Sequence, residues 1–150
     1  MKKFSRIIII AIVIALALSI CSCSTIRDIT RVPKFSKKLM AIADIRDPEQ
    51  ALAQAESIVH PSSPLNNTSI IEKIKADEDL KDLDLESLAS QNYSIGSFSD
   101  IELKFNDPDL GGNIYETKVE VRFGDQVFVV IITILSDSDT MGLYDFDISK

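Results

Sequence analysis

The chain has 150 residues, of which 16 are basic and 23 acidic, giving a formal net charge of −7. This length is enough for one domain with a packed core. The acidic balance argues against nucleic-acid binding, which requires a positively charged surface. The chain contains two cysteines, Cys21 and Cys23. The remainder therefore has no internal disulfide and must be stabilised by an ordinary core.

The first 24 residues have the layout of an export signal. Lys2, Lys3 and Arg6 form a basic start, and residues 7–20 are apolar except for Ser19. This run of 14 residues is short for a bilayer-spanning helix, which needs about 20, and is typical of a signal peptide. With the cysteines that follow, it resembles a bacterial lipoprotein signal. In that family a small residue precedes a cysteine whose sulfur receives a diacylglycerol, and cleavage leaves that cysteine first.

Two cysteines compete for this role. Ser22 directly before Cys23 fits the lipoprotein pattern, whereas Ile20 directly before Cys21 fits it poorly. We expect lipidation of Cys23, with Cys21 as the alternative, and acyl chains such as palmitate as the anchor. A further alternative is an uncleaved anchor with incidental cysteines. The implied location is the extracytoplasmic face of a bacterial cell membrane.

This interpretation divides the chain into three parts. Residues 1–22 are the lipoprotein signal peptide, 23–34 the lipidated cysteine with a short tether, and 35–150 a single α+β domain. Removal of the signal peptide leaves 13 basic and 23 acidic residues, a formal charge of −10. Such a surface repels anionic headgroups, so membrane attachment must come from the lipid or the apolar run.

Two or three helices are predicted at the start of the domain. The first begins near Pro33 and places apolar side chains on one face at Phe35, Leu39, Ile42 and Ala43. Asp47-Pro48-Glu49-Gln50 is an N-cap signal for the second, which Pro61 ends. Ser69 and Glu72 form a capping box for the third. The acidic stretch from Asp77 to Glu86 predicts that this last helix is broken into two parts.

Four strands are predicted after the helices. Apolar residues alternate with polar ones over 101–105, 115–123 and 142–148, which indicates strands with one solvated face. Residues 127–135 are nearly all apolar and predict a central strand. Gly124-Asp125 predicts a two-residue type II′ hairpin turn. The expected fold class is α+β, with two to three N-terminal helices packed on one face of a four-stranded antiparallel meander sheet.

Helices followed by a long antiparallel sheet give an element order that resembles cystatin-like and nuclear-transport-factor-like domains. The resemblance covers Phe35 to Lys150 as element order. The stretch MGLYDFDI also resembles the end of small uncharacterised lipoproteins of Gram-positive bacteria. The resemblance implies a cone-shaped domain with a pocket between helices and sheet. Members of this superfamily are small-molecule enzymes or non-catalytic binding and assembly modules.

Few residues are candidates for chemistry. His60, the single histidine, is expected at a helix C-terminus, where the helix dipole explains it without a catalytic role. The loops at Asp107 and at residues 136–140 lack the ligand spacing of a calcium site, and no other metal-ligand cluster is present. Acidic residues on the strands are expected on the solvated sheet face with basic ones, a set comprising Glu102, Lys104, Glu116, Lys118, Glu120, Arg122, Asp145 and Asp147.

The expected function is a lipid-anchored extracytoplasmic binding or assembly module without catalytic activity or cofactor. Its expected working surfaces are the pocket mouth and the outer sheet face, which would meet a protein partner or a second copy. Tyr93, Tyr115 and Tyr144 are candidates to line these surfaces. The alternative is a small-molecule enzyme of the dehydratase or isomerase type that uses the pocket between helices and sheet.

Overall fold

The computed structural model describes residues 27–78, 80 and 93–150. The chain forms two compact units, residues 1–34 and Phe35–Lys150. The first unit is described over residues 27–34, which are helical. No helix within the described residues is long and apolar enough to cross a membrane. Residues 7–20, Cys21 and Cys23 lie outside the described part.

Three α-helices precede the sheet in the described part of the chain. In the first helix, residues 27–43 are described and helical. The predicted start near Pro33 was therefore wrong. The second helix, α2, spans Pro48–Ser57, and the side chain of Asp47 accepts hydrogen bonds from the backbone N–H groups of Glu49 and Gln50. This confirms the predicted N-cap.

The third helix, α3, spans Ile70–Ala76, and both hydrogen bonds of the predicted capping box at Ser69 are present. A short 3₁₀ helix, η1, spans Pro64–Asn66 between α2 and α3. Most of the predicted second part of α3, residues 79 and 81–86, lies outside the described residues.

The sheet has five antiparallel strands, not the four predicted. They are β1 (Tyr93–Ile95), β2 (Glu102–Asp107), β3 (Gly112–Phe123), β4 (Gln126–Ser136) and β5 (Met141–Ser149). Strands β2 to β5 pair consecutively, which confirms the predicted meander. The additional strand β1 pairs with the far end of β3, so β1 and β2 lie along the same side of β3. Its three residues are too few for a sequence period.

The β3–β4 hairpin sets the register of the sheet. Phe123 pairs with Gln126 across Gly124-Asp125, and Gly124 alone of the two turn residues has a positive φ, 57°. These are the φ signs of the predicted type II′ turn. In this register Tyr115, Thr117 and Val119 share a face with Ile134, Ile132 and Val130.

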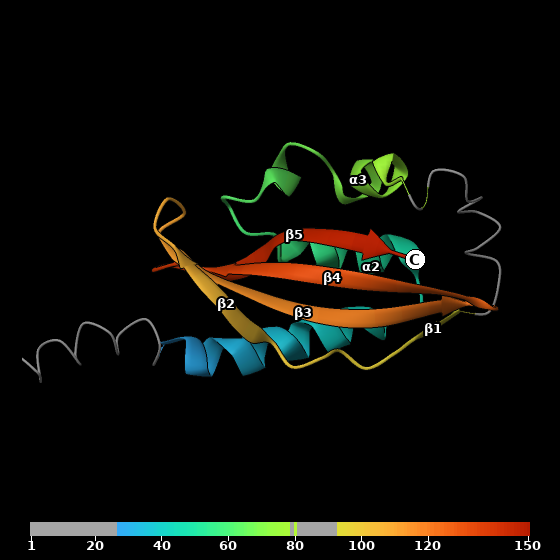
Figure 1. Ribbon diagram of the computed structural model, residues 1–150, viewed down its shortest axis with the longest axis horizontal. Coiled ribbons are helices and arrows are strands. Elements are labelled where there is room, and N and C mark those ends of the chain that lie inside the picture. Colours follow the sequence, from blue (N-terminus) through green and yellow to red (C-terminus); the bar gives the residue numbers. More distant parts are fainter. Residues whose placement is uncertain (1–26, 79, 81–92) are drawn as a thin grey trace, which may run out of the picture. The chain divides into compact units, whose positions relative to one another are not determined.

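That face forms the core with the helices, which lie on one side of the sheet (Figure 1). Buried core residues come from the first helix, such as Phe35 and Leu39, and from the inner face of the strands, such as Phe128, Ile134 and Leu143. The outer face of the central part of the sheet carries the predicted charged residues of β3 and β5 beside the half-buried Val127, Val129 and Ile131 of β4.

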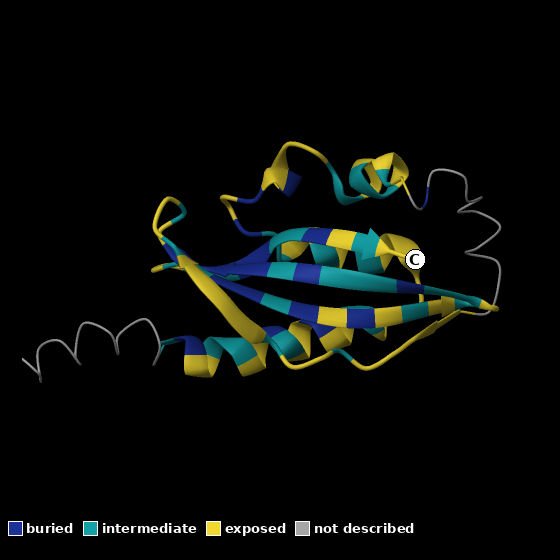
Figure 2. Ribbon diagram, viewed as in Figure 1, coloured by how far each residue is buried: buried dark blue, intermediate teal, exposed yellow. Residues whose placement is uncertain are grey.

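The two edges of the sheet differ. Along β5, the backbone N–H of Leu143 donates to the carbonyl of Ile58, and that of His60 donates to the carbonyl of Leu143. Residues 58–60 thereby act as a short parallel extension beyond β5. Within the described chain, β2 pairs with β3 alone, and Figure 2 shows it exposed along most of its length. The β5 edge is therefore covered at Leu143, whereas the outer edge of β2 pairs with no described segment.

Candidate functional site

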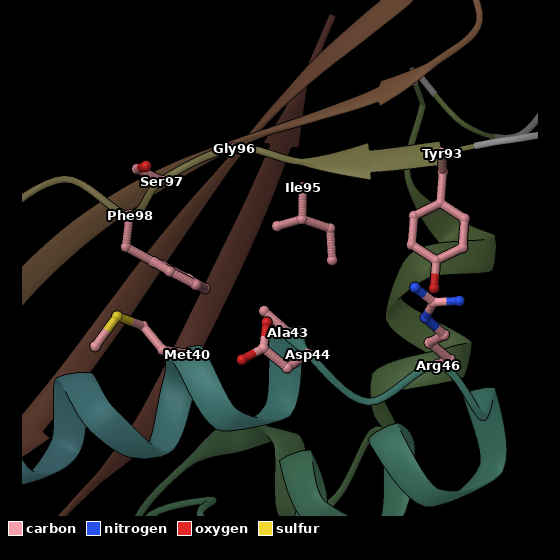
Figure 3. Close-up of a pocket in the computed structure, with 9 residues that line it drawn as sticks. All are labelled: Met40, Ala43, Asp44, Arg46, Tyr93, Ile95, Gly96, Ser97 and Phe98. Atoms are coloured by element: carbon pink, nitrogen blue, oxygen red, sulfur yellow. The ribbon is translucent and has the colours of Figure 1, made fainter.

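A cleft opens between the end of the first helix and strand β1. It has a volume of about 800 Å³ and is lined by Met40, Ala43, Asp44, Arg46, Tyr93, Ile95, Gly96, Ser97 and Phe98. Figure 3 shows the helix on one side and β1 with the following residues on the other. A cleft of this size falls within the range that accommodates ligands or partner side chains.

The helical wall ends in a short connection, the elbow formed by residues 44–46. The first helix stops at residue 43, and the N–H of Ile45 donates to the carbonyl of Ile42 as the chain leaves it. Asp47 then caps α2, so three residues, 44–46, connect the two helices. Asp44 and Arg46 are both exposed in this elbow. The tight connection therefore presents one acid and one base at the rim of the cleft.

The opposite wall is an irregular stretch of the sheet edge. The N–H of Gly96 donates to the carbonyl of Glu120, and the N–H of Ser99 donates to that of Lys118, each at 2.8 Å. Ser97 and Phe98, between these two attachments, belong to no strand. The ladder is interrupted here, and Phe98 turns toward the helix (Figure 3).

Ser99 and Thr117 hold this wall in place. The hydroxyl of buried Thr117 donates to the carbonyl of Ser99 at 2.7 Å. The backbone N–H of Lys118 donates to the hydroxyl of Ser99 at 2.9 Å. These bonds anchor the residues after Phe98 to β3. Thr117 therefore positions the cleft without lining it.

The cleft combines an apolar floor with a polar end. Met40, Tyr93 and Ile95 are large side chains that remain exposed there. The Tyr93 hydroxyl faces the guanidinium of Arg46 (Figure 3). Arg46 makes no ion pair with another described residue. A guanidinium beside a phenol hydroxyl provides donors suited to a carboxylate or another anionic group.

A second, smaller cavity lies between the helices and the sheet, where the family resemblance implied a pocket. It has a volume of about 280 Å³. Its described lining is entirely apolar and comes from all three helices and from the strands, including Ile42, Ala55, Ile74, Val119, Val130 and Phe146. Ala43, Ile95 and Phe98 line both this cavity and the cleft. The described lining therefore supplies no acid or base for catalysis.

His60 lies away from both hollows. It is two residues past Ile58, the C-cap of α2, so its expected position at the helix end was wrong. The side chain is buried, Nδ1 accepts a hydrogen bond from the N–H of Ser62, and Nε2 lies 3.2 Å from Oδ2 of Asp137. His60 thus joins the α2–η1 connection to the β4–β5 loop.

Asp137 has a lowered pKa. Burial alone would raise the pKa of this carboxyl group, but hydrogen bonds from the backbone N–H groups of Thr140 and Asp139 and the nearby His60 outweigh it. Asp107 caps the β2–β3 loop in the same way, with Oδ1 accepting from Asp109 and Leu110. Asp107 and Asp137 thus each accept hydrogen bonds from the backbone of their own loop. No group of three potential metal-ligating side chains occurs within the described residues.

The other predicted surface residues are distributed unevenly. Of the three candidate tyrosines, Tyr93 lines the cleft, whereas Tyr115 is buried and Tyr144 is half-buried away from the cleft lining. The charged outer face is confirmed by ion pairs between Lys104 and Glu116 across strands, and between Arg122 and Glu120 along one strand. Sequence reasoning did not identify Arg46 or Phe98. A single cation in the short elbow before the Asp47 cap was the available signal for Arg46.

No protein-family model, curated protein or solved structure matches this chain.

Proposed function

We propose that the chain is a lipid-anchored extracytoplasmic binding module of a bacterial membrane, without catalytic activity, that holds a protein partner in the cleft between the first helix and β1. We further propose that residues 35–150 belong to the cystatin-like or nuclear-transport-factor-like class. The observation that carries the binding role is the cleft itself. Large apolar side chains remain exposed on its floor, and the guanidinium of Arg46, which has no ion-pair partner among the described residues, lies at its end.

Exposed apolar groups that gather in a concave site are typical of interfaces. Met40, Ile95 and Tyr93 meet this description. A partner that places an apolar side chain on this floor and a carboxylate near Arg46 would bury both with complementary contacts. The partner is thus expected to present an acidic residue close to an apolar one.

The dehydratase or isomerase alternative needs polar side chains that converge on a substrate in an enclosed site. The described lining of the cavity between helices and sheet has none, and the cleft has Asp44 as its one described carboxylate. This favours binding over catalysis as the proposal.

Site-specific photo-crosslinking tests the binding role. A photoreactive amino acid replaces Met40 in the full-length chain, and irradiation is carried out in membranes of the producing organism. We expect one recurrent cross-linked protein, and we expect the yield to fall about tenfold when Arg46→Glu is added, because the change replaces attraction with repulsion.

Lys118 provides the matched control, because it is also exposed but lies on the outer sheet face. The same photoreactive residue at this position should not capture the partner. Equal capture from both positions, or capture from position 40 that Arg46→Glu leaves unchanged, would remove the cleft from the proposal.

A further inference from the structure

Strand β2 is an edge strand that is exposed on both faces. Its residues from Glu102 to Asn106 are all exposed, and Leu103 and Phe105 retain 57% and 56% of their accessible surface. Leu103 pairs with Tyr115 and Phe105 with Ile114, so the two apolar side chains project to opposite faces of the sheet. An open edge that carries exposed apolar residues is a template for a further strand.

Strand β5 forms the opposite edge of the sheet. There the backbone groups of Leu143 are satisfied by Ile58 and His60. No described segment forms such hydrogen bonds with β2, which pairs with β3 alone among the described strands. Within the described chain, the backbone groups of β2 that face away from β3 thus pair with no other strand.

We infer that β2 pairs antiparallel with β2 of a second copy of this chain, in the register centred on Leu103. By two-fold symmetry each contact then occurs twice. Leu103 lies opposite Leu103 of the partner subunit, and Glu102 lies opposite Lys104 of the partner subunit. Both charged pairs attract, and Leu103 faces an apolar residue of the partner subunit.

Charge selects this register among the neighbouring ones. Centring the pair on Lys104 would place two lysines opposite each other, and centring it on Glu102 would oppose two glutamates. Charged side chains on an edge strand discourage pairing with unrelated strands, and here the same charges fit a second copy in one register.

Cysteine cross-linking in native membranes tests the pairing. In the full-length chain, Leu103→Cys would place two sulfurs on directly opposed residues, whose Cβ atoms are about 5 Å apart and within reach of a disulfide. Asn106→Cys is the matched control on the same strand, because its copies would be about 20 Å apart in this register. The unsubstituted chain controls for Cys21 and Cys23.

We expect mild oxidation to give a covalent dimer from Leu103→Cys and not from Asn106→Cys. A monomer from both variants, an equal dimer from both, or a cross-link from position 103 to a different protein would each overturn the inference.

Charge reversal provides an independent test that does not depend on cysteine. Glu102→Lys and Lys104→Glu, each alone, oppose like charges in the dimer and should weaken self-association of the detergent-solubilised chain about tenfold. Glu102→Lys has lysines at both positions and Lys104→Glu has glutamates at both. An equimolar mixture of the two variants should therefore recover association as a mixed dimer. Failure of the mixture to associate more tightly than either variant alone would contradict the register.

Discussion

Nε2 of His60 lies 3.2 Å from Oδ2 of Asp137, and this contact connects the segment after α2 to the loop before β5. Nδ1 of the same ring accepts a hydrogen bond from the N–H of Ser62. A neutral ring with an acceptor at Nδ1 carries its proton on Nε2, which then faces the carboxylate. The histidine therefore has a structural role in closing the β5 edge.

Asp137→Asn should destabilise the domain. The amide oxygen of asparagine retains the turn to Asp139 and Thr140, but its NH₂ group would face the N–H of His60. Opposing two donors at a buried site is expected to lower the free energy of unfolding by about 1–2 kcal/mol. Urea denaturation measures this loss. Asp109→Asn, in the exposed β2–β3 loop, is the control and should change stability by less than about 0.5 kcal/mol.

The lowered pKa of Asp137 predicts an acid-sensitive contribution to stability. Its pKa lies below the ordinary value of 3.8 in the folded protein, so the folded state favours the ionised carboxylate. This contribution is complete above the unfolded value and is lost as the pH falls through the folded value. Denaturation midpoints measured between pH 7 and pH 2 should therefore converge for the native chain and Asp137→Asn at the acid end. A constant difference across the range would disprove the linkage.

Gly142→Ala should be strongly destabilising. A Cβ at this position would lie 2.8 Å from both the N and the Cα of His60, so backbone would have to move. We expect a loss of at least about 2 kcal/mol, because the move disrupts the hydrogen bonds that cover the β5 edge. Gly111→Asn is the comparison. Gly111 has a positive φ of 66° but open space around it, and asparagine tolerates that conformation.

Lys73 should stabilise the packing of α3 against β5. Its Nζ pairs with the carboxylate of Asp145 and lies 5.1 Å from the centre of the Phe146 ring. Both side chains of the ion pair are partly exposed, so Lys73→Met is expected to cost about 1 kcal/mol in thermal denaturation. Lys75→Met, on the same helix at an exposed position, should be neutral. Equal effects of the two changes would mean that the pair contributes nothing.

Thr117→Val should weaken partner binding without altering a residue that lines the cleft. The change removes the hydroxyl that donates to the carbonyl of Ser99 and so releases the wall that carries Phe98. We expect a loss of stability of about 1–2 kcal/mol and a reduced cross-linking yield from position 40. Thr117→Ser keeps the hydroxyl and should restore the yield. If the serine variant binds as poorly as valine, the hydrogen bond does not position the cleft.

Local signals in the sequence predicted much of the fold. The caps at Asp47 and Ser69, the turn at Gly124 and the alternation in β3 depend on neighbouring residues, and each is confirmed. Strand β1 could not be predicted because its three residues gain their pairing from the far end of β3. The early start of the first helix was missed because the short, charged stretch before Pro33 favoured a tether and Pro33 itself favoured a first helical turn.

The cleft was less accessible to sequence reasoning than the fold. It forms where residues 40–46 meet residues 93–98, and no local pattern encodes that approach. Tyr93 was identified because it is amphipathic, but nothing in its neighbours distinguished it from Tyr115, which is buried. Arg46 is a candidate because it forms no ion pair with another described residue and because it faces Tyr93, and neither feature is encoded near it in the sequence.

Membrane anchoring is the central claim of the proposed function, and mass spectrometry of the mature N-terminus tests it most directly. The full-length chain is isolated from membranes of the organism that produces it, and its N-terminal peptide is sequenced with its modification intact. We predict that the chain begins at Cys23 and that its sulfur carries a diacylglycerol. A chain that begins at Met1 with unmodified Cys21 and Cys23 would contradict the claim.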